Sequence, residues 1–233
     1  MKKRGFVEKP VPTSSDELNR MNRDRKTTFL SLSPDLAIEQ INYHRPKENL
    51  VFDTGTVKYI GVNQGEFGGG LYLNEVKADG APFFRGNIQA LIPIDDDLYI
   101  LSGLSHMMSS HGAIHVIRNF KTPSQPILLT LLPDAPAAAL VRVGSGGQKS
   151  IVFVGSSSLM EFTPDNRIEI IAFNAFWKLL YPTTVVMQDG AYYIGMRSGI
   201  AVVDAGVYTG MRSGIAVVNT DGRPALIRYF VPE

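Results

Sequence analysis

Three of the four histidines in this 233-residue chain lie close together in the sequence, at His106, His111 and His115. Neutral imidazoles bind zinc, copper or iron, and a carboxylate such as Glu66 can complete a site of this kind with His106 and His111. The intervals between the histidines match no established metal motif, and His115 falls inside a run of strand-forming residues. The sequence therefore leaves three interpretations open: a metal site, a partner-binding surface, and ordinary packing of a long loop over residues 104–112.

The segment Gly65–Gly70 is a second candidate, because it holds Glu66 and Phe67 among four glycines. Glycine allows positive φ and a close approach of the backbone to a ligand. The segment lacks the glycine spacing of a dinucleotide-binding loop, and it joins two strands, so no helix N-terminus is available to bind phosphate. We expect a glycine bulge in a hairpin; the alternative is a contact surface formed by Glu66 and Phe67.

Other motifs give weaker signals for chemistry. Asp95–Asp97 is acidic, but its position between two strands favours a turn over a calcium loop. Arg197 and Arg212 lie at hairpin tips, where we expect solvated turn residues, with anion contacts as the alternative. Serines are frequent between residues 102 and 110, yet no Gly-x-Ser-x-Gly elbow occurs and no nucleophile–base pair is apparent. The chain has no cysteine, which excludes disulfides and a thiol nucleophile.

Four strand-like segments that end in glycine are the elements that must position these residues. The glycines are 42, 52 and 40 residues apart, and each is followed by a polar turn and a second apolar strand. A repeat of about 40–50 residues built of strands is typical of a β-propeller, since one unit cannot bury its own faces. The four segments are Lys58–Gly61, Leu98–Gly103, Val152–Gly155 and Tyr192–Gly195.

The predicted fold is all-β: a small β-propeller of four to five blades, each an antiparallel four-stranded meander. Four units of strands are expected between residues 49 and 204, with two further strands in residues 27–43 and a short helix or packed loop at 174–180. Strand direction reverses at every turn, so the turns between second and third strands share one end of the fold. That end is predicted to carry the ligand- or partner-binding residues Glu66, Phe67, His106, His111 and Arg197.

A nine-residue segment, Gly195–Val203, recurs without change as Gly210–Val218, at an offset of 15 residues. Fifteen residues form one hairpin with its link rather than a blade. Unbroken identity favours a recent tandem duplication or an engineered insertion that has no function of its own. The alternative is that the extra hairpin supplies strands of a fifth blade beside residues 27–43. The duplicated hairpin, 195–218, lies in a propeller domain predicted to span 27–233.

The net charge of +1 gives no reason to expect nucleic acid or an anionic membrane as a partner. Residues 1–26 are expected to be a solvated, basic N-terminal extension, with a short helix over Asp16–Arg25 that Ser14 can cap. No apolar stretch follows the basic start Met1–Arg4, and none elsewhere is long enough to span a bilayer. We therefore expect a cytoplasmic protein, with the periplasm as the alternative.

The Tyr-Ile-Gly strand, its turn and the following Gly-Leu-Tyr strand resemble bacterial β-propeller repeats found in sensor and binding proteins. Gly65–Tyr72 and Ser102–His106 also resemble segments of uncharacterised bacterial propeller-like proteins. The resemblance covers residues 49–219, and it implies ligand or protein binding more readily than catalysis.

The sequence thus favours a non-catalytic binding module without a cofactor, whose partner is a protein or a small ligand. A toxin-immunity or sensor-type protein would fit this class. The alternative is a metal-dependent hydrolase or lyase with Glu66, His106 and His111 as ligands, although we expect no tightly bound transition metal.

Overall fold

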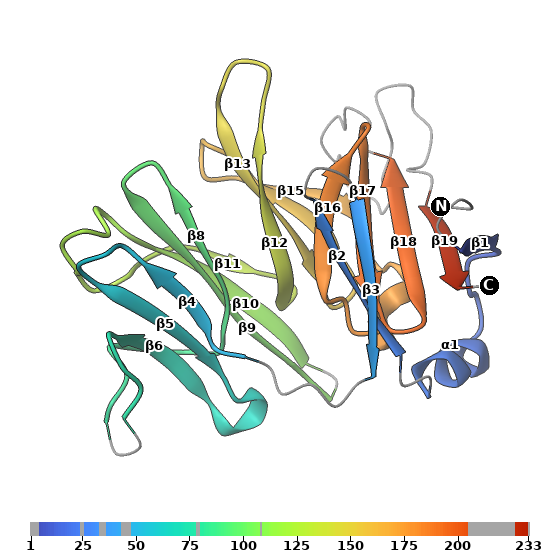
Figure 1. Ribbon diagram of the computed structural model, residues 1–233, viewed down its shortest axis with the longest axis horizontal. Helices are drawn as coiled ribbons and strands as arrows, with labels where there is room; N and C mark the ends of the chain where they lie inside the picture. Colours follow the sequence, from blue (N-terminus) through green and yellow to red (C-terminus); the bar gives the residue numbers. More distant parts are fainter. Residues whose placement is uncertain are drawn as a thin grey trace. The chain divides into compact units, whose positions relative to one another are not determined.

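The computed structural model describes residues 5–23, 26–32, 36–42, 48–77, 80–107, 109–204 and 227–232. Within them the chain is all-β: antiparallel strands dominate, accompanied by one α-helix and two short 3-10 helices (Figure 1). Three sheets have four strands, one has five and one is a two-stranded hairpin. The chain forms two compact units, which we describe separately: unit 1 from residues 1–45, 137–142 and 150–233, and unit 2 from residues 46–136 and 143–149.

Unit 2 contains two four-stranded meanders that follow one another in the chain. The first is formed by β4 (Leu50–Asp53), β5 (Lys58–Asn63), β6 (Gly69–Leu73) and β7 (Phe84–Arg85). The second is formed by β8 (Ile88–Ile94), β9 (Asp97–His106), β10 (Ser109–Ile117) and β11 (Ile127–Leu132). β-Branched and aromatic residues between polar turns favour these strands. One core cluster includes the fully buried Tyr59, Leu71, Ile88, Ile100 and Ile117.

Unit 1 contains a hairpin, a five-stranded sheet and most of a third four-stranded meander. Pro136 and residues 143–149 of that meander belong to unit 2. The hairpin pairs β2 (Lys26–Leu32) with β3 (Leu36–Asn42). One sheet is formed by β12 (Pro136–Val143), β13 (Lys149–Gly155), β14 (Leu159–Phe162) and β15 (Ile168–Ala172). The other is formed by β16 (Thr184–Gln188), β17 (Ala191–Met196), β18 (Gly199–Asp204), β19 (Ile227–Pro232) and β1 (Phe6–Lys9). Trp177, in the 3-10 helix η3 (Phe176–Leu179), is fully buried in their core.

Most of the expected strands are confirmed. All four glycine-ending segments lie in the second strand of a sheet, namely β5, β9, β13 and β17. The two strands expected within 27–43 are β2 and β3, and the helix or packed loop expected at 174–180 is η3. One expectation is wrong. Residues 104–112 do not form a long irregular loop, because β9 continues to His106 and β10 begins at Ser109.

In unit 2 the repeated glycine lies where another sheet comes too close for a side chain. A Cβ atom on Gly61 would lie 2.7 Å from Cγ2 of Ile88, which starts β8. A Cβ atom on Gly103 would lie 2.8 Å from Cδ of Pro136, which starts β12. At Gly61 the missing side chain lets β8, the first strand of the next sheet, pack against β5, and at Gly103 it leaves room for Pro136.

The same relation holds in unit 1 at Gly195 of β17, where the approaching strand is β2. A Cβ atom there would lie 2.6 Å from the carbonyl oxygen of Thr28 and 3.2 Å from Cγ of Leu30. The hydroxyl of Thr183 donates to the same Thr28 carbonyl oxygen at 2.6 Å, so this oxygen is held in place. The hairpin is thus fixed on β17 by backbone contact as well as by apolar packing.

The described part of the N-terminal segment is not a solvated extension, so that expectation is wrong. β1 pairs with β19 (Figure 1), and the side chain of Phe6 is buried. α1 (Ser15–Asn22) starts where predicted, because the Ser14 hydroxyl accepts from the backbone N–H of Glu17 at 3.2 Å. Leu18 and Met21 then pack against the core of unit 1. Contacts with residues far away in the sequence order this segment. Its polar composition gives no indication of these contacts.

The first copy of the duplicated segment, Gly195–Val203, forms the end of β17, a turn at residues 197–198 and most of β18. The second copy lies outside the described residues. β18 pairs directly with β19, with Val203 opposite Ile227. Residues 205–226 therefore connect two strands that pair directly with each other.

We predict that a variant lacking residues 205–219 folds normally and has a Tm within roughly 2 °C of wild type. Shortening a link between adjacent antiparallel strands changes the loop-closure entropy only slightly, and residues 220–226 remain to join them. A thermal melt and a sizing column measure this. A large fall in Tm together with association would show instead that the extra copy is needed to complete the fold.

Candidate functional site

The carboxylate of Glu66 and the imidazole of His106 form an ion pair in unit 2. His106 Nε2 lies 3.0 Å from Glu66 Oε2, and the two side chains are 43% and 49% exposed, histidine first. Glu66 belongs to the 3-10 helix η2 (Gly65–Phe67), and His106 is the last residue of β9. Two second-to-third strand turns therefore bring a carboxylate and an imidazole together in one solvent-accessible site.

Hydrogen bonds fix the turn that carries Glu66. The backbone N–H of Gly65 donates to Oδ1 of Asn63 at 2.9 Å. The carbonyl oxygen of Gly65 accepts from Nδ2 of Asn87 at 2.8 Å, and Asn87 immediately precedes β8. The turn is thus anchored to its own sheet and to the segment that leads into the neighbouring sheet, which carries His106.

Ser109 and His111 lie on the same face of the β9–β10 hairpin as His106. Ser109 is the direct cross-strand partner of His106, and Cβ atoms in such pairs are about 4.5–5.5 Å apart. Ser109 Oγ lies 3.3 Å from Nδ1 of His111, two residues further along the strand. The turn begins with Met107 at φ +53°, the left-handed backbone that tight hairpin turns need.

Two large apolar side chains accompany the polar pair, one on each turn. Phe67 follows Glu66 and is 82% exposed, and Met107 follows His106 and is 91% exposed. Neither side chain contributes to a core cluster among the described residues. They provide apolar contact area for a ligand next to groups that can transfer protons.

The residues proposed as metal ligands do not assemble into a metal site. Across the residue ranges described above, no group of three or more His, Cys, Asp or Glu side chains could hold a metal ion. His111, expected as the third ligand beside Glu66 and His106, has its Nδ1 at the Ser109 hydroxyl instead. The site offers a carboxylate–imidazole pair and a hydroxyl–imidazole pair, which are groups for acid–base and nucleophilic chemistry.

His115 lies within β10, as predicted, and its ring contacts that of Phe84 with 4.7 Å between ring centroids. Burial lowers the pKa of His115, because desolvation disfavours the charged imidazolium. In the unfolded chain the same group titrates near pH 6.5. Unfolded chains therefore take up this proton first as the pH falls, and protonation favours unfolding.

We predict that the free energy of unfolding falls as the pH drops from about 6.5 towards the lower pKa of folded His115, and that this contribution is constant above pH 6.5. A His115→Gln variant should show a shallower decrease over this range. Urea denaturation at a series of pH values measures the slope. An equally steep slope in the variant would mean that other groups cause the acid sensitivity.

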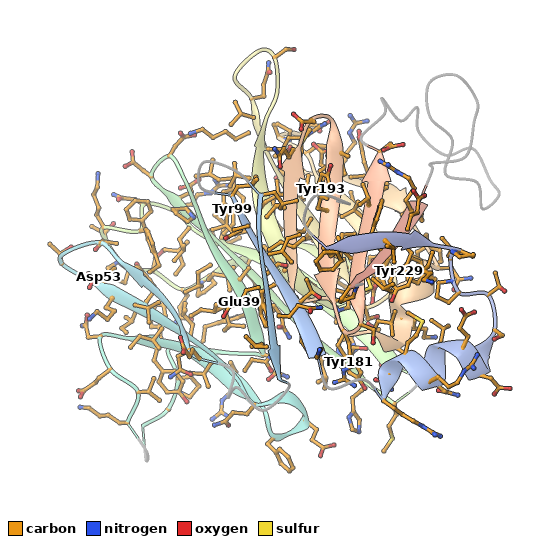
Figure 2. All side chains as sticks on the ribbon, turned by 45° about the vertical axis from the view of Figure 1, so that its right-hand side comes forward. Glu39, Asp53, Tyr99, Tyr181, Tyr193 and Tyr229 are labelled. Atoms are coloured by element: carbon orange, nitrogen blue, oxygen red, sulfur yellow. The ribbon has the colours of Figure 1, made fainter. Side chains whose placement is uncertain are left out.

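Arg197 is not a solvated turn residue, so this expectation is wrong. Its side chain is 8% exposed, and Nη1 donates to the carbonyl oxygen of Asn22 at 2.9 Å and to the Asn22 side-chain oxygen. The guanidinium lies over the ring of Tyr181, 4.4 Å from its centroid (Figure 2 labels this tyrosine). The adjacent Ser198 hydroxyl donates to the carbonyl oxygen of Met21 at 2.7 Å. The hairpin tip therefore caps the C-terminal end of α1 in unit 1.

The acidic segment Asp95–Asp97 forms the turn between β8 and β9, as predicted, with Asp95 at φ +55°. Its carboxylates contact three different basic side chains rather than converging on one point. Asp95 pairs with Lys149, Asp96 with Lys121 and Asp97 with Arg118. The turn has an evident electrostatic role and no arrangement suited to calcium.

No protein-family model and no curated protein matches the chain. Among solved structures, the chain is similar to a GH43 glycoside hydrolase engineered to display both endo-xylanase and exo-arabinofuranosidase activity. The identity is 13% and the TM-score 0.37, over 78% of this chain and 49% of the hydrolase, so the chain spans about half the length of that protein. It is also similar to the computationally designed Ika8 protein, with 8% identity and a TM-score of 0.28 over 91% of this chain and 97% of that one.

The hypothesis of a non-catalytic binding module is corrected by these comparisons. The glycoside hydrolase among the similar structures is a catalytic protein, and the comparisons give no support to a non-catalytic role. Among the described residues, no helix is long and apolar enough to cross a membrane.

Proposed function

We propose that the chain is a hydrolase in which Glu66 and His106 act as a general acid–base pair. The observation that supports this is the 3.0 Å ion pair between an accessible carboxylate and an accessible imidazole. A carboxylate on one ring nitrogen fixes the orientation of the imidazole and leaves the other nitrogen, Nδ1, for a substrate. It also stabilises the imidazolium that forms when His106 takes up a proton.

The surroundings of the pair suit proton transfer to a bound molecule. Asn87 holds the Glu66 turn, so the carboxylate does not have to be ordered when substrate binds. Phe67 and Met107 offer apolar area beside the pair. A substrate that combines an apolar group with a hydrolysable ester, amide or glycosidic bond would use both features.

The proposal is tested with two conservative variants. Glu66→Gln keeps the shape of the side chain but removes its charge, and His106→Asn removes the proton-transfer group. Each should lower kcat/KM by roughly 10²- to 10³-fold on a panel of p-nitrophenyl esters and glycosides. Glu75→Gln is the matched control, because Glu75 is an exposed acid outside the site, and among the described residues its ion-pair partner is Lys77 at 2.9 Å. Wild-type protein that hydrolyses nothing on the panel, or full activity in both site variants, would overturn the proposal.

We also propose that the sheets are blades of a five-bladed propeller in which the β2–β3 hairpin is a short fifth blade. The support comes from contacts within each unit: the second-strand glycine is approached by β8 at Gly61, by Pro136 at Gly103 and by β2 at Gly195. The hairpin therefore occupies, against β17, the position that β8 of the next sheet occupies against β5. Small-angle scattering with a radius of gyration well above about 18 Å, the value for a compact chain of this length, would argue against a closed ring.

A further inference from the structure

We propose that Ser109 is the nucleophile of this site, with His111 as its base, and that the substrates are esters with an apolar acyl group. The inference rests on the hydrolase function proposed above and adds a covalent step to it. It starts from the 3.3 Å distance between Ser109 Oγ and His111 Nδ1. At this distance the imidazole is placed to accept the proton of the serine hydroxyl.

The β9–β10 hairpin places the Ser109–His111 pair on the same face as His106 of the Glu66–His106 pair. Ser109 is the cross-strand partner of His106, and His111 is two residues beyond Ser109, so the three side chains share one face. Glu66 approaches that face through its ion pair with His106. The serine hydroxyl therefore has one imidazole at hydrogen-bond distance along its own strand and a second, carboxylate-bound imidazole across the hairpin.

The two imidazoles can divide the proton transfers of ester hydrolysis. Ser109 Oγ bonds to the ester carbonyl carbon while His111 takes the hydroxyl proton, and the carbon–oxygen bond to the alcohol breaks as protonated His106 gives that oxygen its proton. Water then adds its hydroxyl to the acyl carbon and its proton to His106. The bond from the acyl carbon to Ser109 breaks, and His111 returns the proton to the serine. The products are an alcohol and a carboxylic acid, and no oxidant or further reactant is required.

Exposed apolar residues indicate the part of the substrate that would be recognised. Phe67 and Met107 are the two most exposed large apolar side chains of the described residues, and both belong to the turns that carry the acid–base pair. A short alkyl chain placed on them would lose water-exposed area on both sides. We therefore expect a preference for butyrate and longer acyl esters over acetate.

The test is covalent labelling with a fluorophosphonate probe, followed by peptide mass spectrometry, together with p-nitrophenyl butyrate hydrolysis. Wild-type protein should be labelled at Ser109. Ser109→Ala should lose the label and at least roughly 100-fold in rate, and Ser109→Cys should retain a burst of p-nitrophenol. Ser105→Ala is the matched control, because Ser105 is an exposed serine of the same hairpin on the opposite face, and it should keep both label and rate.

Three results would overturn the inference in distinguishable ways. If Ser109→Ala hydrolyses the ester at the wild-type rate while Glu66→Gln and His106→Asn do not, the acid–base pair works without a serine nucleophile. If the label appears on another residue, the nucleophile is misassigned. If wild-type protein neither reacts with the probe nor hydrolyses any ester or glycoside, the proposed function fails as well.

Discussion

Arg197→Ala should lower the free energy of unfolding by about 2–3 kcal/mol, while the same substitution at Arg212 should change it by less than about 0.5 kcal/mol. The two arginines lie in identical nine-residue segments, so local propensity is the same in both. Arg197 donates to the backbone and side chain of Asn22 and covers Tyr181. Its removal leaves the last carbonyl groups of α1 without their cationic donor.

Thermal melts of the two single variants and of wild type measure this difference directly. For a chain of this length, the expected fall in Tm for Arg197→Ala is roughly 5–10 °C. Equal effects at Arg197 and Arg212 would contradict the assignment of the first copy to the α1 cap. An absence of effect in both variants would mean that either copy can take the position beside α1.

Gly195→Ala should destabilise the protein by about 1–3 kcal/mol, because the new methyl group would meet backbone that cannot move away. Its Cβ atom would lie 2.6 Å from the Thr28 carbonyl oxygen, which the Thr183 hydroxyl already holds. Gly144→Ala is the matched control, since the nearest atom to its Cβ would be the Gln148 carbonyl oxygen at an ordinary 3.6 Å.

Urea denaturation of the two glycine variants gives the comparison. We expect a clear loss at Gly195 and a change within about 0.5 kcal/mol at Gly144. If Gly195→Ala is as stable as wild type, β2 does not pack against β17 as described. The repeated glycine would then reflect strand composition alone and not the approach of another sheet.

The strands could be predicted from sequence because their signals are local. Runs such as Tyr192–Gly195, rich in β-branched and aromatic residues and closed by a turn, specify strands whatever they later contact. The helix start at Ser14 is local for the same reason, since the cap hydrogen bond spans three residues. Long-range partners were not predictable. β1 pairs with β19 near the other end of the sequence, and the Arg197 side chain donates a hydrogen bond to Asn22, 175 residues away.

The site was partly predictable. The reversal of strand direction at each turn placed the turns of Glu66 and His106 at one end, and these two side chains do meet. That they bind a ligand or partner, with Phe67, His111 and Arg197, stays a prediction. The sequence gives no reason to single out Ser109, because the pattern of residues 104–112 favours a loop. Its signal is the two-residue spacing between His106 and Ser109, which in a tight hairpin makes them cross-strand partners.

A double-mutant cycle of Glu66→Gln and His106→Asn on kcat/KM tests the acid–base pair most directly. If the carboxylate acts only by orienting and charging the imidazole, the double variant should lose no more activity than His106→Asn alone. A double variant whose loss equals the product of the two single losses would contradict a pair that works as one unit.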